Sequence, residues 1–559
     1  MNLKGKYLSS TFILLTSTVI VKIISAIYKI PLTAFIGGVG RGYFAYAYNL
    51  CLPVHAVTMG AFPIALSKLV STYNSKRDVA KVLSLKKGSF RLFSLVGIAG
   101  MLILLCAAKP YSVLIAHSPK AIYTVAVLAP SVLFSCMGAS YRGYFEGCLN
   151  MIPTAVSQTV EALFKMIFGL LFAKYSMAYL FKQYQITGTV LGTVVSDEQT
   201  ALSHIYPFTS AFAMLGVTLG AFLSLCYLSV YSKYHRPETK IKLDTKTANK
   251  ELLAFSFPIM VSTCVQSVFQ FLDTATIQLA LSKVDLLVLK NMFSQSLKTV
   301  AVSNTDLPTY VYGVFSAALD FKNLVPGVTM AIGVSAVPAI SRAFEPKNTK
   351  AFSALVNLIY RFTVFLSFIG GIILYVCSEE ILNLFYGKNS PDIVASSVDL
   401  VKYFALTVVL YSLAGTAVFA VQAIGLAQKS IVSYAVSGVV RIVLNLLLVS
   451  DERFVLYGAV VAGATGYALL GVWNIVILCK RTKIRFDFVG VILLPSLAFF
   501  IVLYACEFLF KQPFLPDSTV DLIIIKGAVS VIMYCILCFL CGMPKFKDFF
   551  CDYVIKKNH

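Results

Sequence analysis

The stretch that decides the fold of this chain occurs twice. Its first copy is Gly42-Tyr43-Phe44, then Pro53, then Pro63-Ile64-Ala65-Leu66-Ser67-Lys68. Its second copy, 271–275 residues later, is Gly313-Val314-Phe315, then Pro326, then Pro338-Ala339-Ile340-Ser341-Arg342. Ser157 and Lys165 likewise match Ser433 and Arg441 at one shared offset. Duplicated halves related by an axis along the membrane normal are typical of transporters that rock about a central cavity.

The composition places most of the surface against lipid. The 559 residues are 58% hydrophobic and 13% charged, with a mean hydropathy of +0.81. A soluble domain carries about 25% charged residues because its surface faces water. These values exclude an ordinary soluble domain.

Apolar segments long enough to cross a bilayer recur along the whole chain, since a span needs about 20 apolar residues. We predict about fourteen, at 9–36, 43–68, 90–108, 121–140, 152–173, 206–231, 252–281, 309–337, 354–377, 396–424, 430–449, 455–479, 488–510 and 520–542. The sequence therefore predicts an all-α polytopic membrane protein with two pseudo-symmetric six-helix lobes and two further C-terminal helices.

Basic residues gather after the second, sixth and twelfth segments and in the C-terminal tail. Cytoplasmic loops of membrane proteins carry this excess of Lys and Arg, so both termini are predicted to be cytoplasmic. The same rule accounts for the net charge of +22. No basic patch on a soluble face is indicated, so nucleic-acid binding is excluded as a function.

The domain boundaries follow from the repeat and the loops. We predict an N-terminal lobe at 1–235, a cytoplasmic linker at 236–250, a C-terminal lobe at 251–481, and two extra spans with a basic tail at 482–559. The linker is polar and basic and contains Pro237.

Ionisable side chains inside the apolar segments are the candidate functional residues, because a charge in hydrocarbon is costly unless it faces a cavity or a partner. The candidate substrate-binding cations are Lys22, Lys29, His55, Lys322 and Arg441. The candidate coupling or charge-pair residues are Glu161, Lys165, Asp273 and Asp320.

Spacing separates these residues into different roles. Lys22 and Lys29 are seven residues apart and share a helix face, although Lys29 could also snorkel to the interface. Glu161 and Lys165 have the i, i+4 spacing of a pair that neutralises itself. Asp320 and Lys322 face different directions, so each needs a partner elsewhere.

Asp273 is the only ionisable residue within its apolar segment, and we expect it to couple to a cation or a proton. Four prolines lie deep in predicted helices, where they free backbone carbonyls and permit either gating movements or a static kink. They are Pro53, Pro63, Pro326 and Pro338. Most of the 13 cysteines lie in apolar segments and are expected to be small buried hydrophobes.

No enzyme pattern is present. The sequence has no phosphate-binding loop of the nucleotide-hydrolase type and no cluster of metal-ligand spacing. We therefore expect a protein that is not an enzyme, holds no metal and needs no cofactor other than a coupling ion, H⁺ or Na⁺.

Several stretches together resemble a known group. They are Ile30-Pro31 with Phe35-Ile36-Gly37, Met59-Gly60-Ala61-Phe62-Pro63, Arg142-Gly143-Tyr144-Phe145-Glu146-Gly147, Pro153-Thr154-Ala155-Val156-Ser157-Gln158 and Leu272-Asp273-Thr274. They are similar to the stage V sporulation protein B and YtgP group of the multidrug/oligosaccharidyl-lipid/polysaccharide exporter superfamily, over nearly the whole chain.

The resemblance implies a bacterial cytoplasmic-membrane flippase, expected to be monomeric, for an undecaprenyl-pyrophosphate-linked cell-wall precursor such as lipid II. It implies two lobes around a cationic cavity and two extra helices that form a groove for the lipid tail. Lys22 lies where the group usually has an Arg, so the charge is kept and the bidentate fork is lost.

Two alternatives remain open. One is a drug or cation antiporter of the same fold, against which the Lys-rich cavity argues. The other is a non-transporting membrane scaffold, whose partners would be cell-wall synthesis enzymes. Membrane lipid and the lipid-linked glycan are the partners expected of the flippase.

Overall fold

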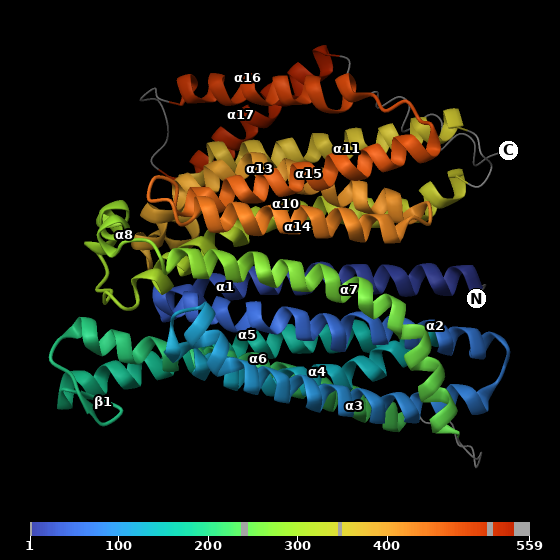
Figure 1. Cartoon of the computed structure of the whole chain (residues 1–559), viewed down its shortest axis with the longest axis horizontal. Coiled ribbons are helices and arrows are strands. Elements are labelled where there is room, and N and C mark those ends of the chain that lie inside the picture. Colours follow the sequence, from blue (N-terminus) through green and yellow to red (C-terminus); the bar gives the residue numbers. More distant parts are fainter. Residues whose placement is uncertain (1–2, 236–243, 345–348, 511–517, 542–559) are drawn as a thin grey trace. The chain divides into compact units, whose positions relative to one another are not determined.

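The structure is a computed structural model that describes residues 3–235, 244–344, 349–510 and 518–541 (Figure 1). The tail beyond residue 541 and most of the predicted linker at 236–250 lie outside these residues. The long helices are α1 (Leu3–His55), α2 (Phe62–Ser75), α3 (Val79–Pro110), α4 (Ile122–Gly147), α5 (Ile152–Thr187), α6 (Glu198–Tyr234), α7 (Thr245–Leu281), α10 (Leu307–Phe344), α11 (Thr349–Val376), α13 (Pro391–Ala423), α14 (Ala427–Leu448), α15 (Leu456–Thr482), α16 (Leu494–Leu509) and α17 (Thr519–Leu540).

Short elements occupy the connections. They are the helices α8 (Leu286–Met292), α9 (Ser294–Leu297) and α12 (Ser378–Leu382), the π-helical stretches Ala56–Ala61, Tyr111–Ile115, Asn383–Gly387 and Val489–Leu493, the 3₁₀ turn Pro119–Ala121, and the strands β1 (Thr189–Val190) and β2 (Thr193–Val194). The two strands pair antiparallel between α5 and α6.

The helices confirm the predicted all-α polytopic membrane protein. In the described ranges, eleven helices are long and apolar enough to cross a membrane, or twelve if the bent helix α7 is one span. One of the eleven, Thr16–Ser75, has 60 residues, about three times the length that one span requires. Each of the fourteen predicted apolar segments coincides with helical structure.

Gly37 divides the first long helix into two arms. Its φ of 64° and ψ of −179° are not helical, and glycine adopts this conformation without a steric penalty. An added Cβ would also meet the ring of Tyr206 at 3.2 Å. The first arm, residues 3–36, contains the whole first predicted segment at 9–36. The second arm, residues 38–55, contains the start of the second predicted segment at 43–68. Helix α7 bends by 43° between Phe257 and Ile259, where Pro258 removes a backbone donor.

The described chain forms two compact units, Met1–Ser316 and Ala317–His559, which we call the N unit and the C unit. Their division lies inside α10 rather than in the predicted linker. The reason is that α7 packs against α1, α2 and α3, where Tyr73 Oη lies 2.5 Å from a Glu251 carboxylate oxygen. The predicted lobe boundaries concern the sequence repeat and stay a prediction.

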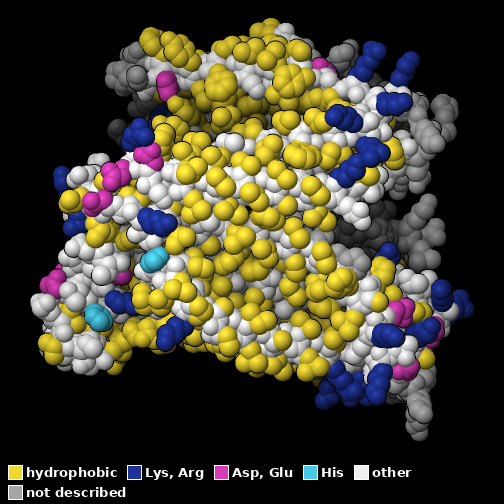
Figure 2. Space-filling model, in the orientation of Figure 1, with side chains coloured by type: hydrophobic (Ala, Val, Ile, Leu, Met, Phe, Trp, Pro, Cys, Tyr) yellow, Lys and Arg dark blue, Asp and Glu magenta, His cyan; other side chains and the backbone are white. Residues whose placement is uncertain are grey.

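In the C unit, α16 and α17 pack on α11 around a core that includes Phe368, Phe499 and Tyr534. Arg361 on α11 forms an ion pair with Asp487, and Lys526 on α17 forms one with Glu380. Tyr375 Oη also donates to Glu507 at 2.6 Å. Figure 2 shows hydrophobic side chains over the middle of each unit on this face, with charged side chains toward the helix ends.

Candidate functional site

A buried ion pair joins three helices of the N unit. Arg142 on α4 contacts the Glu161 carboxylate on α5 through Nη2 at 2.7 Å. It also donates to Ser157 Oγ at 2.9 Å and to Ser224 Oγ on α6 at 2.8 Å. Arg142 is 8% exposed, and a guanidinium suits a buried pair because its fork serves several acceptors at once. Glu161, a predicted coupling or charge-pair residue, therefore has an arginine partner from another helix.

Lys165 lies one turn further along α5 and contacts aromatic rings. Its Nζ is 5.3 Å from the ring centroids of both Tyr28 and Tyr48, one on each arm of α1. Ring faces attract a cation without neutralising it. Gly220 allows α6 to come close here, because a Cβ there would lie 2.7 Å from the Glu161 carbonyl oxygen.

His55 completes this group, which we call the N-unit charge cluster: His55, Arg142, Glu161 and Lys165. The Glu161 carboxylate interacts electrostatically with His55. The imidazole Nε2 is buried and makes no hydrogen bond to the described residues. The cluster brings together three sequence-predicted residues and one that the sequence analysis did not select.

Lys322 and Arg441 meet at one aromatic ring in the C unit. Lys322 Nζ lies 5.5 Å from the centroid of Phe404, 5.8 Å from that of Tyr411 and 5.5 Å from that of Tyr467. The guanidinium carbon of Arg441 lies 4.6 Å from the Tyr467 centroid. We call these five residues the C-unit cation site. Two cations from separate helices therefore lie over the Tyr467 ring.

The sequence repeat explains the similarity of the two sites. Lys165 and Arg441, which match at the shared offset, both lie over tyrosine rings. The matched serines differ in partner, because Ser157 accepts from Arg142 whereas Ser433 Oγ accepts from Asn474 Nδ2 at 2.7 Å. Gly466 makes room in the C unit, since a Cβ there would overlap the Arg441 side chain.

Four other predicted residues belong to neither the N-unit charge cluster nor the C-unit cation site. Lys22 is exposed and Lys29 is half-buried on the first arm of α1. Asp273 on α7 is 7% exposed and interacts electrostatically with Tyr312 of α10. Asp320 is half-buried on α10, two residues before Lys322.

The predicted gating prolines mark irregular backbone. Pro53 and Pro63 flank the π-helical stretch Ala56–Ala61, where the regular hydrogen-bond ladder changes. Pro326 is buried in α10 and cannot donate to the carbonyl of Lys322, four residues earlier. Pro338 lies outside the side chains that the structure describes. Local π-helical geometry is frequent at functional positions.

Sequence reasoning missed two buried arginines. Arg142 was assigned to a loop because the predicted fourth segment ends at residue 140, whereas α4 continues to Gly147. Arg41 fell between two segments, but it is 3% exposed and donates to Thr33 Oγ1 at 2.9 Å. Both arginines adjoin a glycine just outside the end of an apolar segment, and this pattern was the sequence signal that could have found them.

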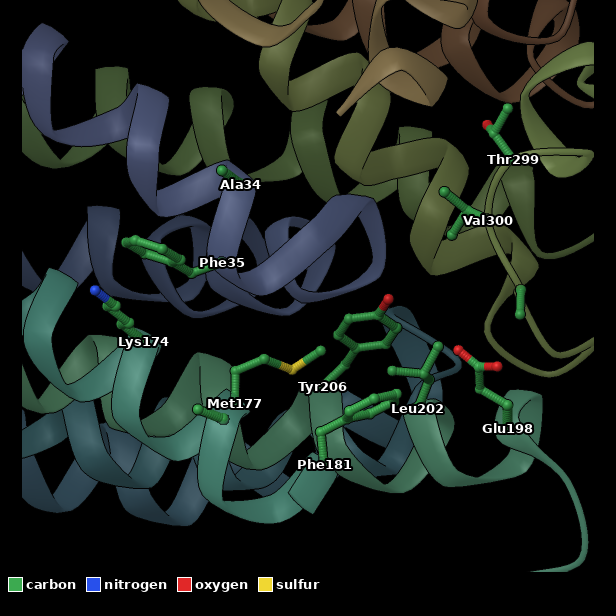
Figure 3. A pocket seen from close by; sticks show the side chains of 12 residues that line it. Ala34, Phe35, Lys174, Met177, Phe181, Glu198, Leu202, Tyr206, Thr299 and Val300 are labelled. Atoms are coloured by element: carbon green, nitrogen blue, oxygen red, sulfur yellow. The ribbon is translucent and has the colours of Figure 1, made fainter. Parts of the chain in front are cut away.

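A pocket of about 510 Å³ lies near the kink at Gly37. Figure 3 shows Met177, Phe181, Leu202 and Tyr206 between Lys174 and Glu198, with Thr299 and Val300 from the loop before α10. Next to it, the Thr200 hydroxyl donates to Asp197 and lowers the pKa of that carboxyl below its usual range. The pocket is mostly apolar and contacts none of the three sequence-predicted residues of the N-unit charge cluster.

The described residues contain no group of His, Cys, Asp or Glu that could hold a metal ion. The two sites consist of cations, aromatic rings and hydroxyl groups together with the Glu161 carboxylate, and their cations can bind an anionic ligand.

Comparisons with known proteins agree with this geometry. The family described as polysaccharide biosynthesis protein matches residues 7–344, and MatE matches residues 287–447. The lipid II flippase MurJ of Bacillus subtilis (strain 168) is 24% identical over 83% of this chain and 81% of its own length. Stage V sporulation protein B of the same organism is 22% identical over 84% of this chain and 82% of its own length.

A solved structure described as lipid II flippase MurJ in an inward closed conformation has the same fold. It superposes with a TM-score of 0.64 at 15% identity and covers 95% of this chain and 98% of its own. The predicted superfamily is confirmed, and these relatives are transporters rather than enzymes. This multi-pass membrane chain belongs to the polysaccharide biosynthesis protein family of the MOP superfamily.

Proposed function

We propose that this protein flips an undecaprenyl-pyrophosphate-linked cell-wall precursor, lipid II or a related lipid-linked oligosaccharide, across the bacterial cytoplasmic membrane. The observation that carries the proposal is the pair of repeat-matched cations, Lys165 and Arg441, each on tyrosine rings inside apolar helices. Cations inside apolar helices mark candidate substrate sites. A pyrophosphate head group is an anionic substrate that such cations can bind.

The charge balance supports an anionic ligand. Arg142 and Glu161 form an ion pair, and Lys165 adds a second cation to the N-unit charge cluster beside His55. The C-unit cation site contributes Lys322 and Arg441. A lysine ammonium acts on phosphate as a compact point charge, and arginine adds a planar fork.

The proposed cycle is alternating access. The pyrophosphate–sugar head enters from the cytoplasmic side and binds the exposed Lys22, near the middle of the first span, and the half-buried Lys29, toward its outer end. The polyprenyl tail stays in lipid beside α16 and α17. Both termini are cytoplasmic in this scheme. The membrane potential or a coupled cation, H⁺ or Na⁺, resets the carrier, with Asp273 or Glu161 as the coupling carboxylate.

The test is complementation. A bacterium depleted of its lipid II flippase would express this protein, and lipid II exposed on the outer face would be measured. We expect restored exposure and, for Lys22→Ala, a fall of about tenfold, the cost of one contact with a charged group. Lys290→Ala, which removes an exposed lysine of α8, is the matched control.

The result decides among the functions. Restored exposure with full activity of Lys22→Ala would remove that lysine from the binding site. No restoration, with the protein present in the membrane, would overturn lipid II as the substrate and leave another polyprenyl-linked glycan or the scaffold function.

A second candidate is a cation antiporter, which the MatE match at 287–447 favours. It predicts that cells expressing the protein export cationic dyes in exchange for H⁺ or Na⁺. The presence of Lys165, Lys322 and Arg441 at the two sites argues against it, because cationic substrates are attracted by cavities lined with acidic groups. Unchanged dye accumulation on expression would exclude it.

A further inference from the structure

The pocket near Gly37 begins at the predicted outer boundary of the hydrocarbon. Lys174 directly follows the fifth predicted apolar segment, and Tyr206 is the first residue of the sixth. Helix α5 has 36 residues, which corresponds to about 54 Å of helix, whereas the hydrocarbon is about 30 Å thick. The part of the pocket beyond Lys174 and Tyr206 therefore lies outside the hydrocarbon, on the side opposite to the predicted cytoplasmic loops.

Four segments of the N unit form the walls of this pocket. Ala34 and Phe35 come from the end of the first arm of α1, and the loop before α10 contributes residues 299–301. The projecting ends of α5 and α6 form the other walls. Together with β1 and β2 they enclose a small core of Leu180, Val190, Val195, Ala201 and Ile205. The Gln199 amide donates to the Val302 carbonyl oxygen and ties the loop to α6, so the walls are held by contacts that need no ligand.

The chemistry changes along the pocket. Figure 3 shows Lys174 at one end and Glu198 at the other, with Met177, Phe181 and Tyr206 between them. Both charged side chains are exposed, and neither has an ion-pair partner among the described residues. Glu198 begins α6, farther from the predicted boundary than Tyr206. The pocket thus offers a cation at the boundary, an apolar and aromatic wall beyond it, and a carboxylate farthest out.

A polyprenyl-pyrophosphate-linked glycan carries its groups in the same order. Its tail lies in the hydrocarbon, its pyrophosphate at the boundary and its sugars in water. A lysine ammonium binds phosphate as a compact charge, the apolar face of a sugar ring can pack on the amphipathic ring of a tyrosine, and a carboxylate accepts hydrogen bonds from hydroxyl groups. The volume of about 510 Å³ lies within the usual range for a small ligand, about 300–1,000 Å³.

We propose that this pocket is a product site, which holds the head group of the lipid-linked glycan once it has reached the outer face. Lys174 binds the pyrophosphate, Phe181 and Tyr206 pack on the sugar rings, and Glu198 accepts a hydrogen bond from a sugar hydroxyl. The inference rests on the proposed function, because a cytoplasmic precursor reaches this side only after its head group has crossed. An outer-leaflet phospholipid shares the phosphate that Lys174 binds, but it has no sugar rings to cover the aromatic wall.

Photocrosslinking in proteoliposomes tests the site without requiring transport, because radiolabelled lipid II can be included in both leaflets. The photoreactive residue benzoylphenylalanine replaces either Phe181, inside the pocket, or Tyr179, which is 71% exposed on the same helix and does not line the pocket. We expect the yield of crosslinked lipid II at position 181 to exceed that at position 179 by about tenfold. Equal yields at the two positions would overturn the product site.

A charge variant tests the pyrophosphate contact. Lys174→Gln should lower the crosslinking yield at position 181 about tenfold, the cost of one contact with a charged group. Lys182→Gln is the matched control, because it removes an exposed lysine of α5 that does not line the pocket, and it should leave the yield unchanged. An unchanged yield with Lys174→Gln would overturn the assignment of that lysine to the pyrophosphate.

Two further probes distinguish the sources of the phosphate. Undecaprenyl pyrophosphate lacks the sugars, and phosphatidylglycerol is an ordinary anionic phospholipid. Each should crosslink at position 181 about tenfold less than lipid II, because neither has sugar rings for the aromatic wall. Phosphatidylglycerol that crosslinks as strongly as lipid II would overturn the glycan as the occupant and leave a general phospholipid site.

Thiol labelling tests the side of the membrane and the occupancy. In intact cells a membrane-impermeant maleimide should label Thr299→Cys, in the pocket wall; labelling only after cell lysis would overturn the product site. In proteoliposomes, lipid II at about ten times its Kd should slow this labelling about tenfold by occupying the pocket. Asn291→Cys, at an exposed position of α8 outside the pocket, should keep its labelling rate.

The product site and the flippase function fail separately. Restored lipid II exposure in the complementation assay, without crosslinking at position 181, would overturn the product site and leave the flippase. Crosslinking that depends on Lys174, without restored exposure, would overturn transport of lipid II and leave a pocket that binds the lipid-linked glycan.

Discussion

Removal of Arg142 tests the buried network of the N unit most directly. Arg142→Ala deletes contacts to Glu161, Ser157 and Ser224, at 2.7–2.9 Å, and leaves a carboxylate without its ion-pair partner between α4, α5 and α6. Breaking a buried pair from one side costs about 3–5 kcal/mol. The Glu161 side chain keeps 29% exposure, so we expect the lower end of that range, about 3 kcal/mol.

The assay is unfolding by sodium dodecyl sulfate in mixed micelles, followed by circular dichroism. The double variant Arg142→Ala with Glu161→Gln should regain part of the lost free energy of unfolding, because the unpaired charge is gone. The matched control is Arg453→Ala, which removes an arginine that is 83% exposed beside Asp451, and it should leave unfolding unchanged. Equal effects of Arg142→Ala and Arg453→Ala would refute the argument that burial makes this pair structural.

Two further predictions concern the C unit. Gly466→Val should push Arg441 away from the Tyr467 ring, because even a Cβ would overlap the arginine side chain; we expect outer-face exposure of the substrate to fall about tenfold at an unchanged membrane level, and an unchanged rate would remove Arg441 from the binding site. Lys526→Ala should lower the free energy of unfolding by about 3 kcal/mol because it leaves Glu380 buried and unpaired; unfolding in mixed micelles measures it, and Lys526→Ala with Glu380→Gln should recover part of the loss.

Hydropathy alone located the helices correctly. A helix that crosses lipid must be long and apolar, because its backbone groups can be satisfied only within the helix. Each of the fourteen predicted segments accordingly coincides with helical structure. The prediction required no knowledge of a particular side-chain contact. The close contact of Gly42 and Gly313 with each other's helices is a feature that the sequence analysis did not predict.

The partners of the charged residues could not be predicted in the same way. The i, i+4 spacing favoured a pair between Glu161 and Lys165, whereas the ion-pair partner that the structure places at 2.7 Å is Arg142, from another helix. Lys165 lies over Tyr28 and Tyr48 from the two arms of α1. Such contacts depend on how helices pack, and local spacing carries no information about that.

The sequence by itself determined the membrane class, the approximate helix positions, the internal repeat and the set of costly intramembrane charges, because each follows from local composition or from similarity along the chain. The tertiary structure decided which charges neutralise each other, which lie on aromatic rings and where two glycines allow helices to cross. The physical reason is the sequence separation over which each property is set. Hydropathy is a property of consecutive residues, whereas an ion pair or a close helix crossing exists only once separate helices have packed.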